Sequence, residues 1–199
     1  MPKYILLLIV FIIGCHYAQT NDRQKAIELN NKAVELYNKF YDDTEIIKYI
    51  LQLYDEAIEA DSLYEMAYIN KSNLLIEFGR CEEALQTLDR ITTLRKDLVS
   101  YWSMSGYILE AMGQKKEAEK RYRDDISKLD SIIENEQDSL LIYFEVQRAF
   151  LLLLIEGKIK GIREYEKLKT KYPDDQYIIS QELLFETFDR QKFISNYCK

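Results

Sequence analysis

Few side chains in this sequence of 199 residues could act as nucleophiles or as acids and bases near neutral pH. There are three cysteines and one histidine: Cys15, Cys81, Cys198 and His16. An enzyme site needs acid, base or nucleophile groups that converge in space, and we find no glycine-rich phosphate loop, nucleophile elbow or metal-ligand spacing. The many carboxylates follow helix spacing on solvated faces. The sequence therefore predicts no catalytic residue, no metal site and no cofactor.

Cys15 stands at the end of a short apolar segment. Lys3 is followed by an uncharged run over residues 4–13 and then by Gly14 and Cys15. The run is too short to span a bilayer, which takes about 20 residues, but it suits the core of a secretory signal. Residues 12–15 resemble the bacterial lipobox, which implies cleavage before Cys15 and a lipid on its sulfur. A signal cut elsewhere and a buried N-terminal helix are the alternatives.

The residue after the cysteine bears on the destination of the chain. It is His16, not the acidic residue that retains some lipoproteins at the inner membrane. This favours a cell-envelope location at the outer membrane, on its periplasmic or its surface face. We therefore predict a signal peptide over residues 1–14, a lipidated tether over 15–22 and a folded domain over 23–199.

The composition of the folded part favours helices. The chain has only 6 Gly and 2 Pro. Many short strands would need more of these residues to form the turns between them. Hydrophobic residues make up 47% and charged residues 31%, as in a globular protein rather than a disordered one. The net charge is −7 without a cluster of Lys or Arg, so nucleic acid is excluded as the expected partner.

Three kinds of residue recur at a spacing of 34 residues: Gly79 and Gly113, Ala84 and Ala118, and Tyr68 and Trp102. The pattern resembles the tetratricopeptide repeat, in which a helical hairpin has an early aromatic residue, a glycine at the turn and a small residue where the helices cross. The resemblance implies an all-α solenoid of about four hairpins plus a C-terminal capping half-repeat. Asp125 departs from the pattern, which has a small residue there. A plain helical bundle is the alternative.

The middle copies, over residues 65–98 and 99–132, carry the resemblance most clearly. A first copy places helices over 26–40 and 44–60, and a fourth, over 139–173, has Gly157 at its turn. About nine surplus residues lie near 133–138 by comparison with the 34-residue period. We expect Tyr68, Trp102 and Tyr122 in the core and Ala84 at a close helix crossing.

Cys81 and Cys198 are the cysteines left for the folded domain. Cys81 opens the second helix of the second copy, and Cys198 follows the final helix, several helices further along. Packed helices lie about 8–10 Å apart, whereas a disulfide needs Cα atoms within about 7 Å. Although the expected compartment could oxidise them, we predict a buried, unpaired Cys81 and a free thiol at Cys198.

The resemblance also implies a concave groove, lined by the first helix of each repeat, that holds an extended peptide or a partner helix. Projected onto this sequence, the groove residues are Asn30, Tyr37, Asn70, Asn73, Ser103 and Tyr107. One subfamily grips a C-terminal carboxylate with cations, but of the matching positions here only Asn70 fits. We expect Asn73 and Tyr107 to face the groove and to matter little for folding. Solvated polar residues without a role are the alternative.

These features together predict a membrane-anchored, non-enzymatic scaffold or adaptor of the bacterial envelope. The chain resembles tetratricopeptide lipoproteins of Gram-negative bacteria such as the Bacteroidota. Its expected partner is an envelope protein or peptide, and it would touch the membrane through the lipid anchor. The alternative is an accessory lipoprotein of an uptake system that binds a carbohydrate or another small ligand, for which we expect an exposed aromatic shelf outside the groove.

Overall fold

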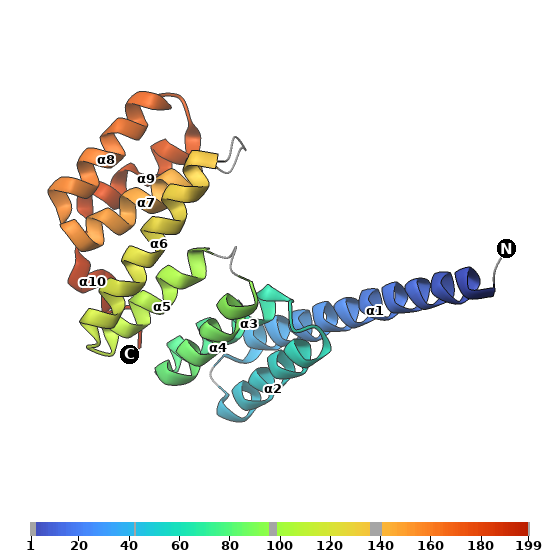
Figure 1. Ribbon diagram of the computed structural model, residues 1–199. Coiled ribbons are helices and arrows are strands. Elements are labelled where there is room, and N and C mark those ends of the chain that lie inside the picture. The colour runs from blue at the N-terminus through green and yellow to red at the C-terminus, as the bar shows by residue number, and fades with distance from the viewer. Residues whose placement is uncertain (1–2, 42, 96–98, 136–140, 199) are drawn as a thin grey trace. The chain divides into compact units, whose positions relative to one another are not determined.

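The structure is a computed structural model, and it describes the backbone of residues 3–41, 43–95, 99–135 and 141–198. Side chains are described for residues 21–41, 43–95, 101–135 and 141–198. Within these ranges the chain is helical and has no strand (Figure 1). The helices are α1 (Lys3–Phe40), α2 (Thr44–Ala60), α3 (Glu65–Glu77), α4 (Cys81–Leu94), α5 (Val99–Ala111), α6 (Lys115–Asn135), α7 (Leu141–Glu156), α8 (Lys158–Lys171), α9 (Gln176–Thr187) and α10 (Arg190–Ile194).

The predicted succession of helical hairpins is confirmed. The helices expected over 26–40 and 44–60 match the end of α1 and both bounds of α2. Gly157, with φ 89°, separates α7 from α8 as expected. The surplus residues lengthen α6 as far as Asn135, and residues 136–140 lie outside the described part.

The chain divides into two compact units, residues 1–74 and residues 75–199. In unit 1, α1 includes the residues 15–22 that the sequence assigns to the tether. The division into signal peptide, tether and folded domain stays a prediction. The side chain of Cys15 lies outside the described residues.

In unit 1, α1 packs along α2 because both helices present small and apolar residues to each other. Ala26 and Ala33 lie two turns apart on α1, and both are fully buried. Ile50 and Ala57 of α2 are also fully buried. Tyr68 of α3 is fully buried, which confirms its predicted place in the core.

In unit 2, a hydrogen-bonded turn recurs at the predicted 34-residue spacing. After α3 the Gly79 amide donates to the Ile76 carbonyl at 3.1 Å. The next amide, that of Arg80, donates to the Leu75 carbonyl at 2.8 Å. The same two bonds, of 2.9 and 2.8 Å, recur around Gly113. Both glycines have positive φ, 67° and 81°, which this helix-ending motif requires and residues with a Cβ rarely adopt.

Helices α5, α6, α7 and α8 pack in succession in unit 2. Tyr122 of α6 is fully buried beside Gly106 of α5, where a Cβ would lie 2.3 Å from the Tyr122 Cε1. Ala118, one turn earlier on α6, is buried as well, and so is Ala84 of α4. The predicted core position of Tyr122 is confirmed, and both alanines are buried, as a close helix crossing requires.

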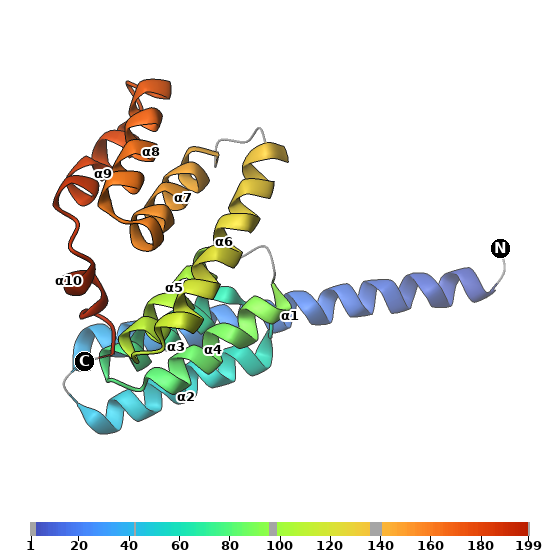
Figure 2. The same cartoon turned by 60° about the vertical axis from the view of Figure 1, so that its left-hand side comes forward.

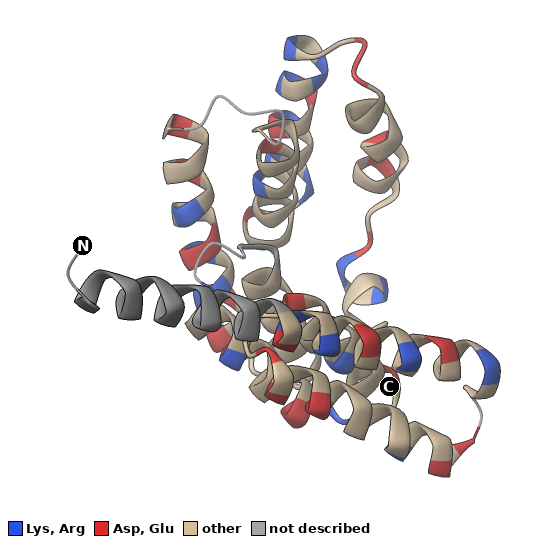
Figure 3. Cartoon of the chain, turned by 90° about the vertical axis from the view of Figure 1, so that its right-hand side faces the viewer, with Lys and Arg blue, Asp and Glu red and all other residues tan. Residues whose placement is uncertain are grey.

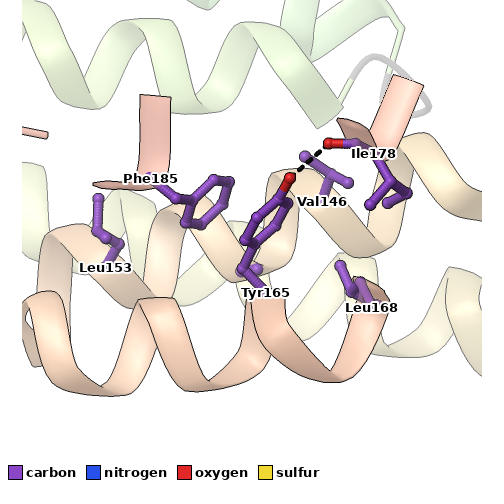
Figure 4. Packing of buried hydrophobic residues seen from close by; sticks show 7 residues of the cluster. Val146, Leu153, Tyr165, Leu168, Ile178 and Phe185 are labelled. Carbon is purple, nitrogen blue, oxygen red and sulfur yellow. Dashed lines mark hydrogen bonds between the residues drawn. The ribbon is translucent and has the colours of Figure 1, made fainter. Parts of the chain in front are cut away.

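A second cluster holds α7, α8 and α9 together (Figure 4). The rings of Tyr165 and Phe185 stack with centroids 4.2 Å apart and an interplanar angle of 7°. The Tyr165 hydroxyl donates to the backbone carbonyl of Ile178 at the start of α9. This bond satisfies a polar group that would otherwise be costly to bury, so α9 is fixed as the last long helix of the unit.

After α9 the chain turns back, and α10 contacts α5 (Figures 1 and 2). Asp189 starts α10 by accepting a hydrogen bond from the Lys192 amide at 2.9 Å. The return places the C-terminal segment beside a helix about 80 residues earlier in the sequence. A regular solenoid has only neighbour-to-neighbour packing, and unit 2 departs from it here.

Charged residues of both signs are interspersed along the helices (Figure 3). Many form ion pairs within a helix, such as Lys48 with Glu45 and Arg123 with Glu119. Among the helical residues with described side chains, no helix is both long enough and apolar enough to cross a membrane.

Candidate functional site

The candidate site is a set of aromatic rings on α5, α6 and α7 that the C-terminal segment covers. We call Tyr107, Tyr122 and Phe150 the aromatic face, and residues 188–198 the strap. The Tyr107 ring lies 5.7 Å from that of Tyr122 and 6.5 Å from that of Phe150, measured between centroids. From the strap, Phe193 approaches Tyr107 to 5.0 Å and Tyr197 approaches it to 5.4 Å. Such edge-on and tilted contacts are the favourable geometries for aromatic pairs.

An ion pair joins the strap to the edge of the aromatic face. Arg190 donates through Nε and Nη2 to the two carboxylate oxygens of Glu110, at 2.8 and 3.1 Å. Its Nη1 donates to the Leu154 carbonyl at 2.6 Å. The Tyr122 hydroxyl also donates to Glu110, at 3.0 Å. Glu110 is buried, so the bidentate hydrogen bonds from Arg190 replace those that its carboxylate would make with water.

The electrostatics of the face follow from its burial. Burial raises the pKa of Tyr122, and the neighbouring Glu110 carboxylate raises it further. Burial likewise raises the pKa of Tyr107, with Tyr197 and Asp125 adding to the shift. Both phenols are therefore neutral at physiological pH and act as hydrogen-bonding rings rather than as bases.

A disulfide between Cys81 and Cys198 ties the end of the strap to the first turn of α4, which corrects the sequence prediction of two unpaired thiols. Their Cα atoms lie 5.7 Å apart, within the range for a disulfide. The prediction was wrong because it placed Cys198 at the far end of a straight stack, whereas the strap returns across α5. Cys198 has φ 60°, a left-handed conformation that is unusual for a residue with a Cβ.

A buried polar cluster lies next to the aromatic face. The Ser103 hydroxyl donates to one carboxylate oxygen of Asp125, and the Gln147 amide donates to Ser103 at 3.4 Å. Burial raises the pKa of Asp125 to about 7, although the Ser103 hydrogen bond and two nearby cations oppose the shift. Trp102, predicted as a core residue, is only half-buried, and Lys128 Nζ lies 3.0 Å from its ring centroid.

Four of the predicted groove residues belong to unit 1. The structure brings two of them together. The side-chain amide of Asn70 donates a hydrogen bond to the side-chain oxygen Oδ1 of Asn30 at 2.8 Å. Asn30 of α1 is buried, in contrast to its expected exposure on the groove wall, because its side chain is bonded to Asn70 of α3. Asn73 is exposed as expected, and Tyr37 and Asn70 are half-buried. A binding role for these residues stays a prediction.

Ser103 and Tyr107, the predicted groove residues of unit 2, are placed differently from the prediction. Ser103 is fully enclosed and bonded to Asp125, so it does not line an open surface. Tyr107 lies on α5, and Phe193 and Tyr197 pack against its ring. Tyr107 therefore does not face an open groove, and its small role in folding stays a prediction.

The sequence favours a short final helix through Phe193 and Tyr197, but the part that the strap residues play in this site was not predicted. Arg190, Phe193 and Tyr197 follow the last regular helix, where the 34-residue pattern gives no position to assign. Two signals were present. The segment is unusually aromatic, and two cysteines remained in a chain expected in an oxidising compartment.

A hollow of about 360 Å³ between α6, α7 and α8 is a weaker candidate. Its charged lining residues pair with one another: Lys171 with Glu145 at 2.8 Å, and Lys167 with Glu164 at 2.8 Å. Mutual pairing leaves little charge to select a ligand. Over the described ranges, no three His, Cys, Asp or Glu side chains lie where they could hold a metal ion.

No protein-family model matches the sequence, and no curated protein matches it significantly. Among solved structures, the chain is similar to one described as "Crystal structure of YrrB: a TPR protein with an unusual peptide-binding site". The two are 18% identical, with a TM-score of 0.43, and the match covers 84% of this chain and 96% of that chain. A similarity of this degree does not extend to shared binding. What the structure itself establishes is an all-α chain of helical hairpins, the second unit of which holds a segment of its own chain on an aromatic face.

Proposed function

We propose that this protein is a non-enzymatic scaffold of a bacterial cell envelope that binds a protein or peptide partner while a lipid on Cys15 holds it at a membrane. The supporting observation is the contact between the aromatic face and the strap. There, unit 2 holds a peptide segment through aromatic packing, a two-pronged Arg–carboxylate pair and one backbone carbonyl. These are the contacts by which protein surfaces recognise peptides.

The membrane anchor rests on the sequence around Cys15. A thioether-linked lipid together with a further acyl chain would hold the protein stably at a bilayer, since one chain alone binds only marginally. His16 at the following position favours the outer membrane. The partner is then an envelope protein within reach of that membrane.

The alternative, binding of a carbohydrate or other small ligand, predicted an exposed aromatic shelf. Within the described part, Tyr143 and Tyr177 are partly exposed neighbours with ring centroids 5.9 Å apart. Their planes are inclined by 37°, so the two rings do not form one flat platform on which a sugar could stack. The scaffold is the better-supported function.

The proposal is tested in intact cells by photo-cross-linking from single positions. A cross-linking residue in place of Lys192, exposed on α10, samples the strap and its surroundings, and one in place of Lys120, exposed on α6, is the matched control. We expect a discrete protein adduct from position 192 that is absent from position 120. Identical adducts from both positions, or none from either in membrane-bound protein, would count against a scaffold that uses this surface.

A further inference from the structure

The strap contacts unit 2 in the manner of a bound peptide. Its apolar anchors, Phe193, Ile194 and Tyr197, are buried or half-buried, and Arg190 pairs with Glu110 although its own side chain is exposed. The exposed residues Gln191 and Lys192 lie on the other side of α10. A few buried anchors separated by solvated positions are typical of a short helix in a groove.

The surface beneath the strap is built without it. Tyr107 and Phe150 come from α5 and α7, and Tyr122 is held against Gly106 by the packing of α5 on α6. Glu110 also accepts a hydrogen bond from Tyr122, a residue outside the strap. Removal of the strap would therefore uncover an aromatic floor with a carboxylate at its edge, which suits a peptide with a cation and aromatic side chains.

The disulfide determines how firmly the strap occupies this surface. With Cys198 bonded to Cys81, the strap is an intramolecular ligand, and an outside peptide competes against a high effective concentration. The residue Cys198 is partly exposed whereas Cys81 is buried, so we expect a thiolate to attack at Cys198 rather than at Cys81. Once the bond opens, the remaining contacts of the strap are reversible.

Building on the proposed function, we propose that the aromatic face is a peptide-binding site closed by the strap and opened by thiol–disulfide exchange. A thiolate of a dithiol reductant attacks the Cys198 sulfur and displaces Cys81 as a thiolate, which gains a proton. The second thiol of the reductant then displaces Cys198, so the reductant ends as a disulfide and both cysteines as thiols. The peptide that binds has the same pattern of side chains as the strap. It has an Arg, an aromatic residue three positions later and a second aromatic residue four positions after that.

The test uses the full-length chain in detergent and a fluorescent synthetic peptide of residues 187–198 with serine in place of Cys198. The fluorescence anisotropy of the peptide is measured while oxidised protein, reduced protein or a reduced Arg190→Ala/Phe193→Ala variant is added. The strap of this variant should compete poorly with the peptide. We expect no binding to the oxidised protein, binding to the reduced protein, and binding at least ~10-fold tighter to the double variant. Glu110→Gln added to the double variant should weaken binding by ~10-fold or more. Reduced Lys192→Ala, the control from the exposed side of α10, should behave as the reduced parent.

Three results would overturn the inference. Equal binding to oxidised and reduced protein would show that the disulfide does not control access. A reduced double variant that keeps its helical circular dichroism but binds no peptide would show that the strap is only a structural cap. Loss of helical structure on reduction, or in the double variant or in Arg190→Ala alone, would place the strap in the core. The probe is the chain's own sequence, so these outcomes are independent of whether cross-linking in cells finds a partner.

Discussion

Replacing Asp125 by asparagine is predicted to stabilise unit 2 at neutral pH and to remove a pH dependence from its unfolding. The Asp125 side chain is fully buried, and the hydrogen bond from Ser103 serves one of its two oxygens. Burial raises the pKa of this carboxyl from 3.8 to about 7. Asparagine keeps an acceptor for Ser103 and has no charge to desolvate, so the variant lacks the cost of ionising this position.

The size and sign of the effect follow from the shift. A change from 3.8 to about 7 is roughly three pKa units at about 1.4 kcal/mol each, or about 4 kcal/mol as an upper value. The folded-state pKa lies above that of the unfolded chain, so the proton is bound more tightly in the folded state. The stability associated with it is fully present below about pH 4 and is lost as the pH rises through about 7.

Urea unfolding between pH 4 and pH 8, followed by the fluorescence of Trp102, measures this effect. The chain has 1 Trp, and it lies in unit 2, so the signal reports the unit that contains Asp125. The free energy of unfolding of Asp125→Asn minus that of the parent should be small at pH 4 and reach about 2–4 kcal/mol by pH 8. The control is Asp124→Asn, at the exposed neighbouring position. A difference that does not change with pH, or that Asp124→Asn reproduces, would refute the reasoning.

Cys15→Ser should move the protein from the membrane fraction to the soluble fraction and remove acylation, as followed by fractionation and metabolic lipid labelling; a variant that stays membrane-bound would disprove the anchor. Ala84→Leu and Ala118→Leu should each lower the free energy of unfolding by about 1–3 kcal/mol, because both alanines are buried where helices cross. Unchanged thermal midpoints in both would show the helix packing to be misassigned. Gly106→Ala should cost a similar ~1–3 kcal/mol, because the new methyl would lie 2.3 Å from the Tyr122 Cε1. Its circular dichroism melt should fall below that of the parent, and an unchanged melt would contradict the contact.

The helical hairpins could be predicted because their signals are local and periodic. Gly79 and Gly113 end helices through backbone bonds within a few residues, and Ala118 and Tyr122 lie one turn apart on the same helix. Such features repeat wherever the same turn and crossing repeat. The glycine turn is also retained after the inserted residues, because Gly157 follows the end of α7 although its spacing from Gly113 is not 34 residues.

The site could not be predicted in the same way because it depends on contacts between distant segments. No periodic signal pairs Arg190 with Glu110 or Cys198 with Cys81, and a solenoid extended in a straight line keeps them apart. The departure from the repeat pattern at Asp125 was visible, but its partner Ser103 lies 22 residues away on another helix. Polar pairings of this kind are set by the packing of the helices and not by sequence spacing.

The disulfide also sets how unit 2 responds to mechanical load. A pulling force transmitted along the chain enters at Cys81 and leaves at Cys198 through the covalent bond, so the 117 residues of sequence separation bear no tension. At about 3.3–3.6 Å per residue, this segment has roughly 400 Å of contour length, which cannot extend under force until the disulfide is reduced. Unit 1 has no disulfide within its described residues, so its helices would extend first. Single-molecule stretching would then give a short oxidised trace that lengthens by this amount in the presence of a reductant.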